Sequence, residues 1–146
     1  MKTIVAALDF SDVTNDLLEV ARKMALAHQA TLYLLHVEPP EPDFVGYEPG
    51  PEHVRNSVAQ EAIRHFKEEN TFRNELRAAG IDAHSLVIQG PTAEKVVSEA
   101  ESLNAEMIII GSHGHGPVYR VVMGSVGQAI ITHADCPVLI VPSKQK

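Results

Sequence analysis

"MIIIGSHGHGPVYRVVMGSVGQAI", residues 107–130, begins with an apolar run and then places five glycines within seventeen residues. An uninterrupted apolar run is typical of a strand that is covered on both faces. Glycine permits backbone torsions and close approaches that side chains forbid. The stretch therefore predicts a buried strand whose carboxyl end leads into backbone held close to another group, followed by a helix that starts at Gly124 and Ser125.

Strand and helix signals alternate along the rest of the chain. We expect strands over residues 3–9, 31–37, 82–90, 105–111 and 136–142, and helices over residues 13–28, 54–79, 91–102 and 125–133. Five strands separated mostly by helices predict one α/β domain with a parallel sheet and right-handed crossovers. The segment 38–52 holds five of the nine prolines and predicts a loop or flap.

Two local features of the helices can also be predicted. Ser11 or Asp12 is a suitable cap for the first helix. The long helix carries apolar residues mostly four positions apart, and we expect these residues to face the core or an interface. The helix is also a candidate for a bend near Asn70. These apolar positions are Val54, Val58, Ala62, Phe66, Leu76 and Ala79.

Composition narrows the classes of function. The chain has 146 residues and a net charge of −7, with 19 acidic and 12 basic residues, which argues against broad nucleic-acid binding. No apolar run approaches the roughly 20 residues that span a bilayer. Cys136 is the single cysteine, which fits a reducing compartment. Because residues 1–9 have the pattern of a strand rather than of a leader peptide, we expect a cytoplasmic location.

The glycine pattern favours phosphate as the ligand, although the familiar loops are absent. No Gly-Lys pair is present, and Tyr119 stands where a dinucleotide fingerprint needs its third glycine. The remaining spacing is G-x2-G-x9-G-S, formed by Gly111, Gly114, Gly124 and Ser125. Free amides at a helix N-terminus attract anions. Ser125 could either cap this helix or bind a phosphate oxygen, and Arg120 offers a cation, so a triphosphate is a suitable ligand.

With its flanking segments, this pattern resembles the ATP-binding subclass of the universal stress protein family. "VAALDFSD" is similar to the first strand of that family and its aspartate, and "LLHV" to the second strand. "GSHGHG" and "MGSVGQAIITHADCPVLIVP" are similar to its loop, last helix and last strand. The likeness covers nearly the whole chain, residues 1–146. It implies a Rossmann-like sandwich with the strand order 3-2-1-4-5.

The resemblance also implies a site and an assembly. Asp9 would contact the adenosine near Ala7, and Val37 would meet the adenine through its backbone. The ribose and phosphates would be held by Gly111, His113, Gly114, Gly124, Ser125 and Val126, with Arg120 as a further candidate. A homodimer would pair the last strands through Val138, Leu139, Ile140 and Val141, and dimers could associate into a tetramer.

We expect no metal site made by the protein alone. His113, His115, His133 and Cys136 are spaced like loop, surface and packed residues, and too few of them converge to hold zinc. Mg²⁺ would instead arrive with ATP, bound mainly by phosphate oxygens.

Three classes of function follow. The first is a regulatory, stress-response protein in which bound ATP, ADP or AMP changes oligomerisation or a partner such as a membrane transporter. The second is a slow ATP hydrolase or phosphotransferase, for which Asp9, His113 and Arg120 are the only nearby candidates and form no convincing set of base and cation. The third is a structural or chaperone-like dimer that does not need nucleotide. We favour the first and assign no catalytic residue.

Overall fold

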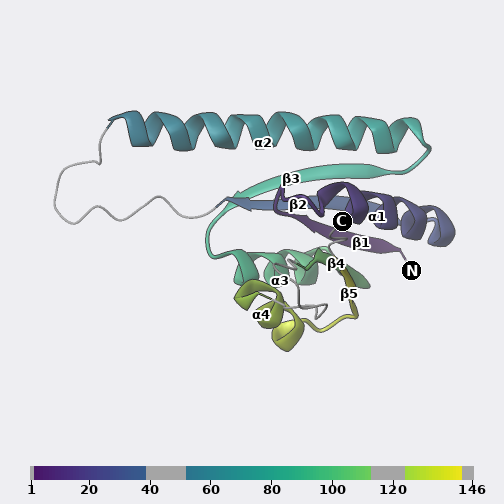
Figure 1. Cartoon of the computed structure of the whole chain (residues 1–146). Helices are drawn as coiled ribbons and strands as arrows, with labels where there is room; N and C mark the ends of the chain where they lie inside the picture. Colours follow the sequence, from purple (N-terminus) through teal and green to yellow (C-terminus); the bar gives the residue numbers. More distant parts are fainter. Residues whose placement is uncertain (1, 39–51, 113–123, 143–146) are drawn as a thin grey trace.

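The computed structural model describes residues 2–38, 52–112 and 124–142 of the chain (Figure 1). In chain order the elements are β1 (Thr3–Leu8), α1 (Thr14–His28), β2 (Thr31–Glu38), α2 (Glu52–Ala78), β3 (Ala83–Gln89), α3 (Thr92–Ser102), β4 (Met107–Gly111), α4 (Ser125–His133) and β5 (Val138–Val141). The alternation of strands and helices predicted from the sequence is confirmed, with boundaries that differ by at most two residues. The segment predicted as a flap, residues 38–52, lies almost entirely outside the described residues.

The five strands form one sheet in the order β3-β2-β1-β4-β5, and all neighbours are parallel. The fold class and strand order predicted from the sequence are therefore confirmed. β1 lies in the middle and pairs with β2 on one side and β4 on the other, with Leu8 opposite His36 and Ala6 opposite Ile109. All five carboxyl ends consequently reach the same edge of the sheet, where ligands of open α/β proteins bind.

Helices cover both faces of the sheet. α1 and α2 lie on one face and α3 and α4 on the other (Figure 1). Successive strand residues point to opposite faces, so Leu32 and Leu34 of β2 join the core under α1 and α2. Leu35 and Val37 of the same strand join the core under α3 and α4. This alternation fixes which residues of β2 can meet a ligand on each side.

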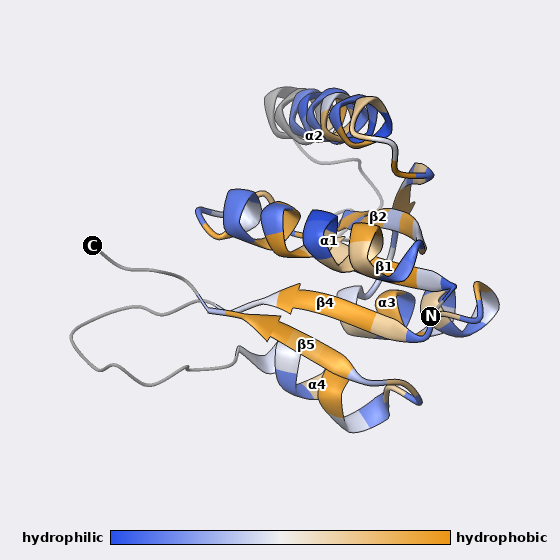
Figure 2. Cartoon of the chain, turned by 90° about the vertical axis from the view of Figure 1, so that its right-hand side faces the viewer, coloured by the Kyte–Doolittle hydropathy of each residue, from blue (hydrophilic) through white to orange (hydrophobic). Residues whose placement is uncertain are grey.

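Hydropathy is distributed as this burial requires. β4 and β5 are almost continuously hydrophobic in Figure 2, whereas α2 is mainly hydrophilic. Ile108, Ile109 and Ile110 of β4 are each at most 4% exposed. The apolar run that opens the stretch 107–130 is thus a central strand buried on both faces.

The start of α1 differs from the sequence prediction. Val13 occupies the N-cap position with no side-chain cap, so the prediction that Ser11 or Asp12 caps this helix is wrong. The Asp9 carboxylate accepts a hydrogen bond from the Ser11 amide at 3.0 Å, and the Thr14 amide donates to the Ser11 carbonyl at 3.1 Å. Because the Asp9 side chain binds the Ser11 amide, residues 9–11 form a turn and the helix begins only at Thr14.

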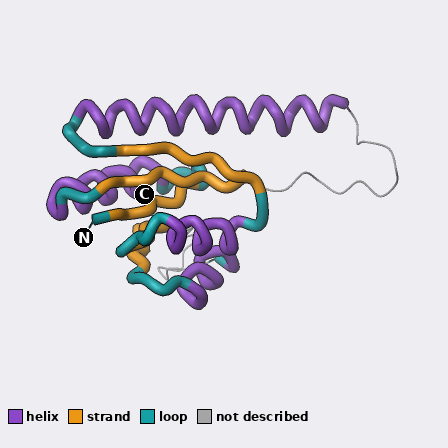
Figure 3. The backbone as a smooth tube through the Cα atoms, turned by 180° about the vertical axis from the view of Figure 1, so that it is seen from behind, coloured by secondary structure: helices purple, strands orange, loops and turns teal. Residues whose placement is uncertain are grey.

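The long helix α2 lies alongside β3 and β2 and runs in the opposite direction to these strands (Figure 3). It continues through Asn70 as one helix to Ala78, so the candidate bend is not found. Leu76 is buried, but Phe66 is 53% exposed, so the apolar stripe predicted for this helix is only partly core. The side chains of Val54 and Val58 lie outside the described residues.

One carboxyl group lies beneath this helix. Glu69 is completely buried, and neither of its carboxyl oxygens has a hydrogen-bond partner among the described residues. Burial disfavours the charged form and raises the pKa of Glu69 from 4.5 to about 8, against a smaller lowering by the Arg73 guanidinium. Glu69 is therefore mainly protonated at neutral pH.

Replacing Glu69 with glutamine should remove a pH dependence of stability. Between about pH 4.5 and 8 the folded chain holds a proton that the unfolded chain releases, so the free energy of unfolding falls as pH rises and levels off above pH 8. Relative to the wild type, Glu69→Gln should gain up to about 1.4 kcal/mol for each pH unit in this window. Urea unfolding across the window measures the difference, with the exposed Glu75→Gln as control. Parallel pH profiles for wild type and Glu69→Gln would contradict the burial argument.

Candidate functional site

A cavity of about 330 Å³ opens at the carboxyl ends of β1, β2 and β4. It lies on the side of the sheet covered by α3 and α4. Its lining residues are Ala7, Leu8, Asp9, Leu35, His36, Val37, Thr92, Val96, Ile110, Gly111, Gly124, Ser125, Val126, Gly127 and Ile130. The volume is at the lower end of the range for small-molecule sites.

Seven of the ten binding residues named from the sequence line this one cavity. Ala7, Asp9, Val37 and Gly111 come from the strand ends, and Gly124, Ser125 and Val126 come from the start of α4. His113, Gly114 and Arg120 lie outside the described residues. Segments more than 100 residues apart in the chain are thus brought to one place, as the carboxyl-end rule for parallel sheets predicts.

The first turn of α4 presents backbone amides to the cavity. Gly124 is the N-cap in an extended conformation, and no side chain caps this end within the part of the chain that the structure describes. Its carbonyl accepts the hydrogen bond of the Gln128 amide at 3.1 Å. The amides of Ser125, Val126 and Gly127 come before Gln128, so no carbonyl within the helix can accept their hydrogen bonds. They can therefore bind an anion. Of the two roles suggested for Ser125, that of N-cap is wrong, because Ser125 is the first residue inside the helix.

The opposite wall of the cavity is aliphatic. Leu35 and Val37 approach from β2, Ile110 from β4 and Ile130 from α4. Val96 and Thr92 add one face of α3, which the sequence reasoning did not include. The sequence spacing could have indicated them, because residues 92 and 96 are one turn apart on a helix that begins just beyond the carboxyl end of β3. These side chains give the cavity an apolar surface.

Charge in the cavity is sparse. Asp9 carries the only carboxylate among the described lining residues, and no lysine or arginine is among them. The ring of His36, which contributes to the lining, faces the other side of the sheet, where it contacts Phe10 and His65. Within the described part of the wall, polar binding must therefore come from Asp9, Thr92, Ser125 and the main chain.

Gly111 is required by packing as well as by its place at the cavity. A Cβ atom at this position would lie 2.4 Å from Cγ1 of Val13, the buried residue at the start of α1. A Cβ at Gly124 would meet nothing within 4 Å. The first glycine thus lets α1 approach β4, whereas the second leaves space open at the cavity.

These two glycines should respond differently to alanine. Gly111→Ala should lower the free energy of unfolding by about 1–3 kcal/mol, because the branched Val13 side chain cannot move aside without disturbing the core. Gly124→Ala should lower it by less than about 1 kcal/mol, the cost of a poorer N-cap. Equilibrium urea unfolding compares the variants. Equal stabilities would show that Val13 does not hold α1 against Gly111.

Cys136 and His133 do not form a metal or nucleophile site in the described structure. His133 is exposed on α4, and Cys136 is a half-buried free thiol. Burial, with a smaller contribution from the Asp135 carboxylate, raises the pKa of the Cys136 thiol, which disfavours the reactive thiolate. The other two residues considered for zinc, His113 and His115, lie outside the described residues.

Comparison with known proteins agrees with this fold. The sequence model of the universal stress protein family matches residues 1–142. The chain belongs to this family. A universal stress protein of Thermus aquaticus is 34% identical over 143 residues, which cover 96% of this chain and 98% of that protein.

Solved universal stress proteins have the same fold. UspA from Lactobacillus plantarum superposes with a TM-score of 0.79 at 21% identity, covering 96% of this chain and 97% of that one. The universal stress protein from Archaeoglobus fulgidus in complex with dAMP has a TM-score of 0.67 at 21% identity, covering 96% and 97%. A universal stress protein in complex with cAMP has a TM-score of 0.66 at 19% identity, covering 98% of each chain.

Two further features of this universal stress protein concern the edge of its sheet and the character of its helices. β5 forms one edge of the described sheet and pairs only with β4 on its inner side. Val138, Leu139 and Ile140 are half-buried, and Val141 is buried. No helix in the described ranges is long and apolar enough to cross a membrane.

Proposed function

We propose that this universal stress protein binds an adenine nucleotide in the cavity at the carboxyl ends of β1, β2 and β4, and that nucleotide occupancy regulates its assembly or a partner protein. The observation that carries the proposal is the composition of that cavity. An aliphatic wall, one carboxylate and the uncapped start of α4 line the same space of about 330 Å³. The relatives of the same fold that bind dAMP and cAMP support an adenine nucleotide as the ligand.

Each part of the nucleotide has a suitable partner. The adenine would lie against Leu35 and Val37, with polar contacts to the backbone of β2, near Ala7. The Asp9 carboxylate, already held by the Ser11 amide, would accept hydrogen bonds from ribose hydroxyls. The phosphates would bind the amides of Ser125 and Val126 beside Gly124, where the helix dipole favours negative charge.

The remaining predicted contacts extend this proposal. Gly111 bounds the cavity at the end of β4, and we propose that His113, Gly114 and Arg120 complete the ribose and phosphate contacts. Mg²⁺ would be bound chiefly by phosphate oxygens. ATP is the preferred candidate because the sequence resembles the ATP-binding subclass of the family, and ADP and AMP are the alternatives that a titration separates.

A regulatory role fits the described site better than catalysis. Phosphoryl transfer needs a group that orients the nucleophile and cations that neutralise developing charge. Asp9 is the only carboxylate of the described wall, and the closed turn at Ser11 engages it. Slow hydrolysis remains the second proposal, and a dimer that acts without nucleotide is the third.

Two matched substitutions at Gly124 test the phosphate position. Asp and Asn are both good N-caps and similar in size, and a side chain at this position meets no packed atom, so both variants should stay folded. Gly124→Asp should bind ATP at least about tenfold more weakly than Gly124→Asn, because its carboxylate would repel the phosphates. Adenosine, which lacks phosphate, should bind both variants equally. Calorimetric titration of nucleotide-free protein measures these affinities.

Two results would count against the site. Equal ATP affinities for the Asp and Asn variants would show that the phosphates do not bind at the start of α4. Failure of the wild type to bind ATP, ADP or AMP, with or without Mg²⁺, would favour the dimer that needs no nucleotide.

The regulatory step requires that one assembly state bind nucleotide more tightly than another. We propose that this state is a homodimer paired along the edge strand β5 through Val138, Leu139, Ile140 and Val141, with the tetramer as a further association of dimers. The partner would be a cytoplasmic protein or a membrane transporter that senses the assembly.

Saturating ATP should therefore shift the distribution of sedimentation coefficients in analytical ultracentrifugation. At an ATP concentration just sufficient to fill the wild-type site, Gly124→Asp should show a smaller shift than Gly124→Asn, because its weaker affinity leaves more of its sites empty. An identical distribution for the wild type with and without ATP would contradict control of assembly, while leaving nucleotide binding intact.

A further inference from the structure

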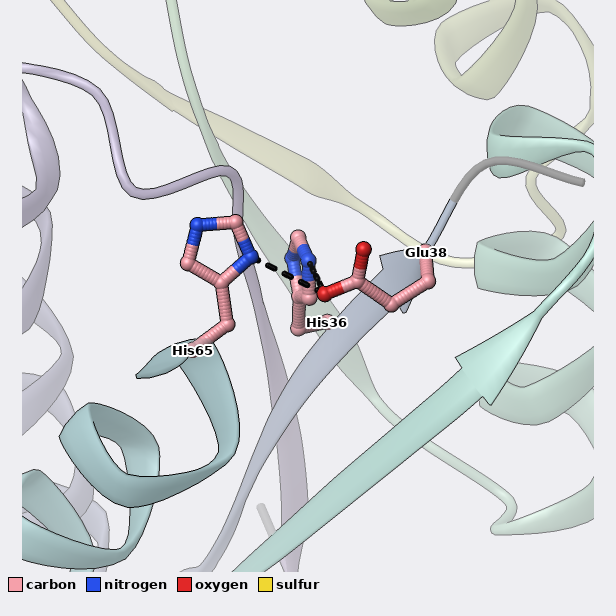
Figure 4. Close-up of side chains that lie close together, drawn as sticks. All are labelled: His36, Glu38 and His65. Atoms are coloured by element: carbon pink, nitrogen blue, oxygen red, sulfur yellow. Dashed lines mark hydrogen bonds and ion pairs between the residues drawn. The ribbon is translucent and has the colours of Figure 1, made fainter. Parts of the chain in front are cut away.

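Three side chains converge on the face of the sheet opposite the nucleotide cavity (Figure 4). His36 and Glu38 come from the end of β2, and His65 comes from α2. Nε2 of His36 and Nδ1 of His65 each lie 2.9 Å from the same carboxylate oxygen, Oε1 of Glu38. The three ligand atoms all lie within 4.8 Å of one another. Residues 27 positions apart thus place two ring nitrogens around one carboxylate oxygen.

The cluster is shielded from solvent and contains no permanent cation. The side chains of His36, Glu38 and His65 are 7%, 15% and 12% exposed. No lysine or arginine of the described residues forms an ion pair with Glu38; its partners are the two histidines. A carboxylate in so little water needs a positive partner.

The hydrogen bonding of His36 shows where its lone pair points. Nδ1 of His36 lies 2.7 Å from the Leu8 carbonyl oxygen. A carbonyl only accepts, so Nδ1 carries a hydrogen, and Nε2 of the neutral ring directs its lone pair at the Glu38 oxygen. Two acceptors at 2.9 Å need either a shared proton or a metal ion between them. A ring held by a backbone carbonyl through one nitrogen, with the other nitrogen directed at the ion, is the usual arrangement of a metal-binding histidine.

The ring of His65 is held mainly by packing. Its Nε2 lies 3.9 Å from the Glu61 carboxylate one helical turn earlier, beyond hydrogen-bonding distance, so the ring can present either an N–H or a lone pair at Nδ1 to Glu38. The Phe10 ring stacks on His65 with centroids 4.3 Å apart and meets the edge of His36 at 4.7 Å. Both imidazoles are therefore fixed in orientation before any ion binds.

We propose that His36, Glu38 and His65 bind one divalent transition-metal ion, Zn²⁺ being the ion that fits their chemistry. Two histidines and one glutamate form a recurrent set of three zinc ligands, with a fourth position left for water. In tetrahedral zinc sites neighbouring ligand atoms are roughly 3.3 Å apart, so binding an ion would open the two 2.9 Å contacts slightly and bring the two ring nitrogens, which lie within 4.8 Å of each other, to that spacing. The ion would join α2 to β2.

This site is separate from the nucleotide cavity and from its Mg²⁺. Side chains alternate along β2, so Leu35 and Val37 face α3 and α4, whereas His36 and Glu38 face α2. This proposal departs from the sequence-based prediction that the protein alone provides no metal site, which rests on other histidines and Cys136. His36 and Glu38 have the i, i+2 spacing of strand residues on one face, but the sequence does not show that α2 brings His65 to them.

Zinc titration of the metal-free full-length chain, without nucleotide, tests the proposal. Calorimetry should give one tight Zn²⁺ site in the wild type, and binding of Co²⁺ to the same site should produce the visible absorption of a four-coordinate ion. His65→Gln and Glu38→Gln should each weaken Zn²⁺ binding by about 100-fold or more, because each removes one of three ligands. Glutamine can keep a hydrogen bond within the cluster in both variants.

The matched control is His133→Gln, which removes an exposed histidine outside the cluster and leaves every other histidine and Cys136 in place. It should bind Zn²⁺ as the wild type does. Saturating Zn²⁺ should raise the midpoint of thermal unfolding of the wild type and of His133→Gln, but not of the two cluster variants. If His65→Gln does not fold, the Zn²⁺ affinity of Glu38→Gln alone tests the proposal.

Absence of a tight Zn²⁺ site in the wild type would overturn the proposal and leave a hydrogen-bonded cluster of two histidines around a carboxylate. Zn²⁺ binding that is equally strong in His65→Gln and Glu38→Gln would overturn it as well, because the ion would then be held elsewhere in the chain.

Discussion

The parallel pairing of β1 with β4 is the constraint on which the rest of the structure depends. These strands are not consecutive, so the chain must build outward from β1 in one direction through β2 and β3, and in the other through β4 and β5. α1, which follows β1, therefore covers one face of the sheet, and α4, which follows β4, covers the other. The cavity bounded by Asp9, Gly111 and Ser125 lies at this switch point of the sheet.

Much of this could be predicted from the sequence because the signals are local. The run Ile108–Ile110 requires cover on both faces, and Gly124 followed by Ser125 marks a helix start, so the sheet and one wall of the cavity follow. The start of α1 could not be predicted from cap preference, because the Asp9 carboxylate engages the Ser11 amide and shifts the helix. Gly111 was expected to leave room for a ligand. The structure shows that a side chain there would clash with Val13, which belongs to an element far away in the chain.

Long-range polar contacts were beyond sequence reasoning for the same reason. Glu69 lies three residues after Phe66 and seven before Leu76, on the apolar stripe of α2, but a glutamate in a hydrophilic helix is by residue type expected at the surface, and only the docking of α2 shows that it is buried. His65 meets Glu38 across 27 residues. Both cases depend on where α2 lies over the sheet, which residue type and composition do not specify. The buried carboxyl group of α2 and the histidine–glutamate contact between α2 and β2 therefore cannot be identified from any sequence motif.

β2 presents an aliphatic wall to the cavity through Leu35 and Val37 and a polar cluster to α2 through His36 and Glu38. Its two-residue period leaves no tolerance for a change in length. Inserting or deleting one residue upstream in this strand would turn the imidazole and carboxylate into the cavity and the aliphatic side chains toward α2. Both surfaces would be lost in a single event. The strand can therefore vary by substitution in the course of evolution, but insertions and deletions should be confined to the connections around it.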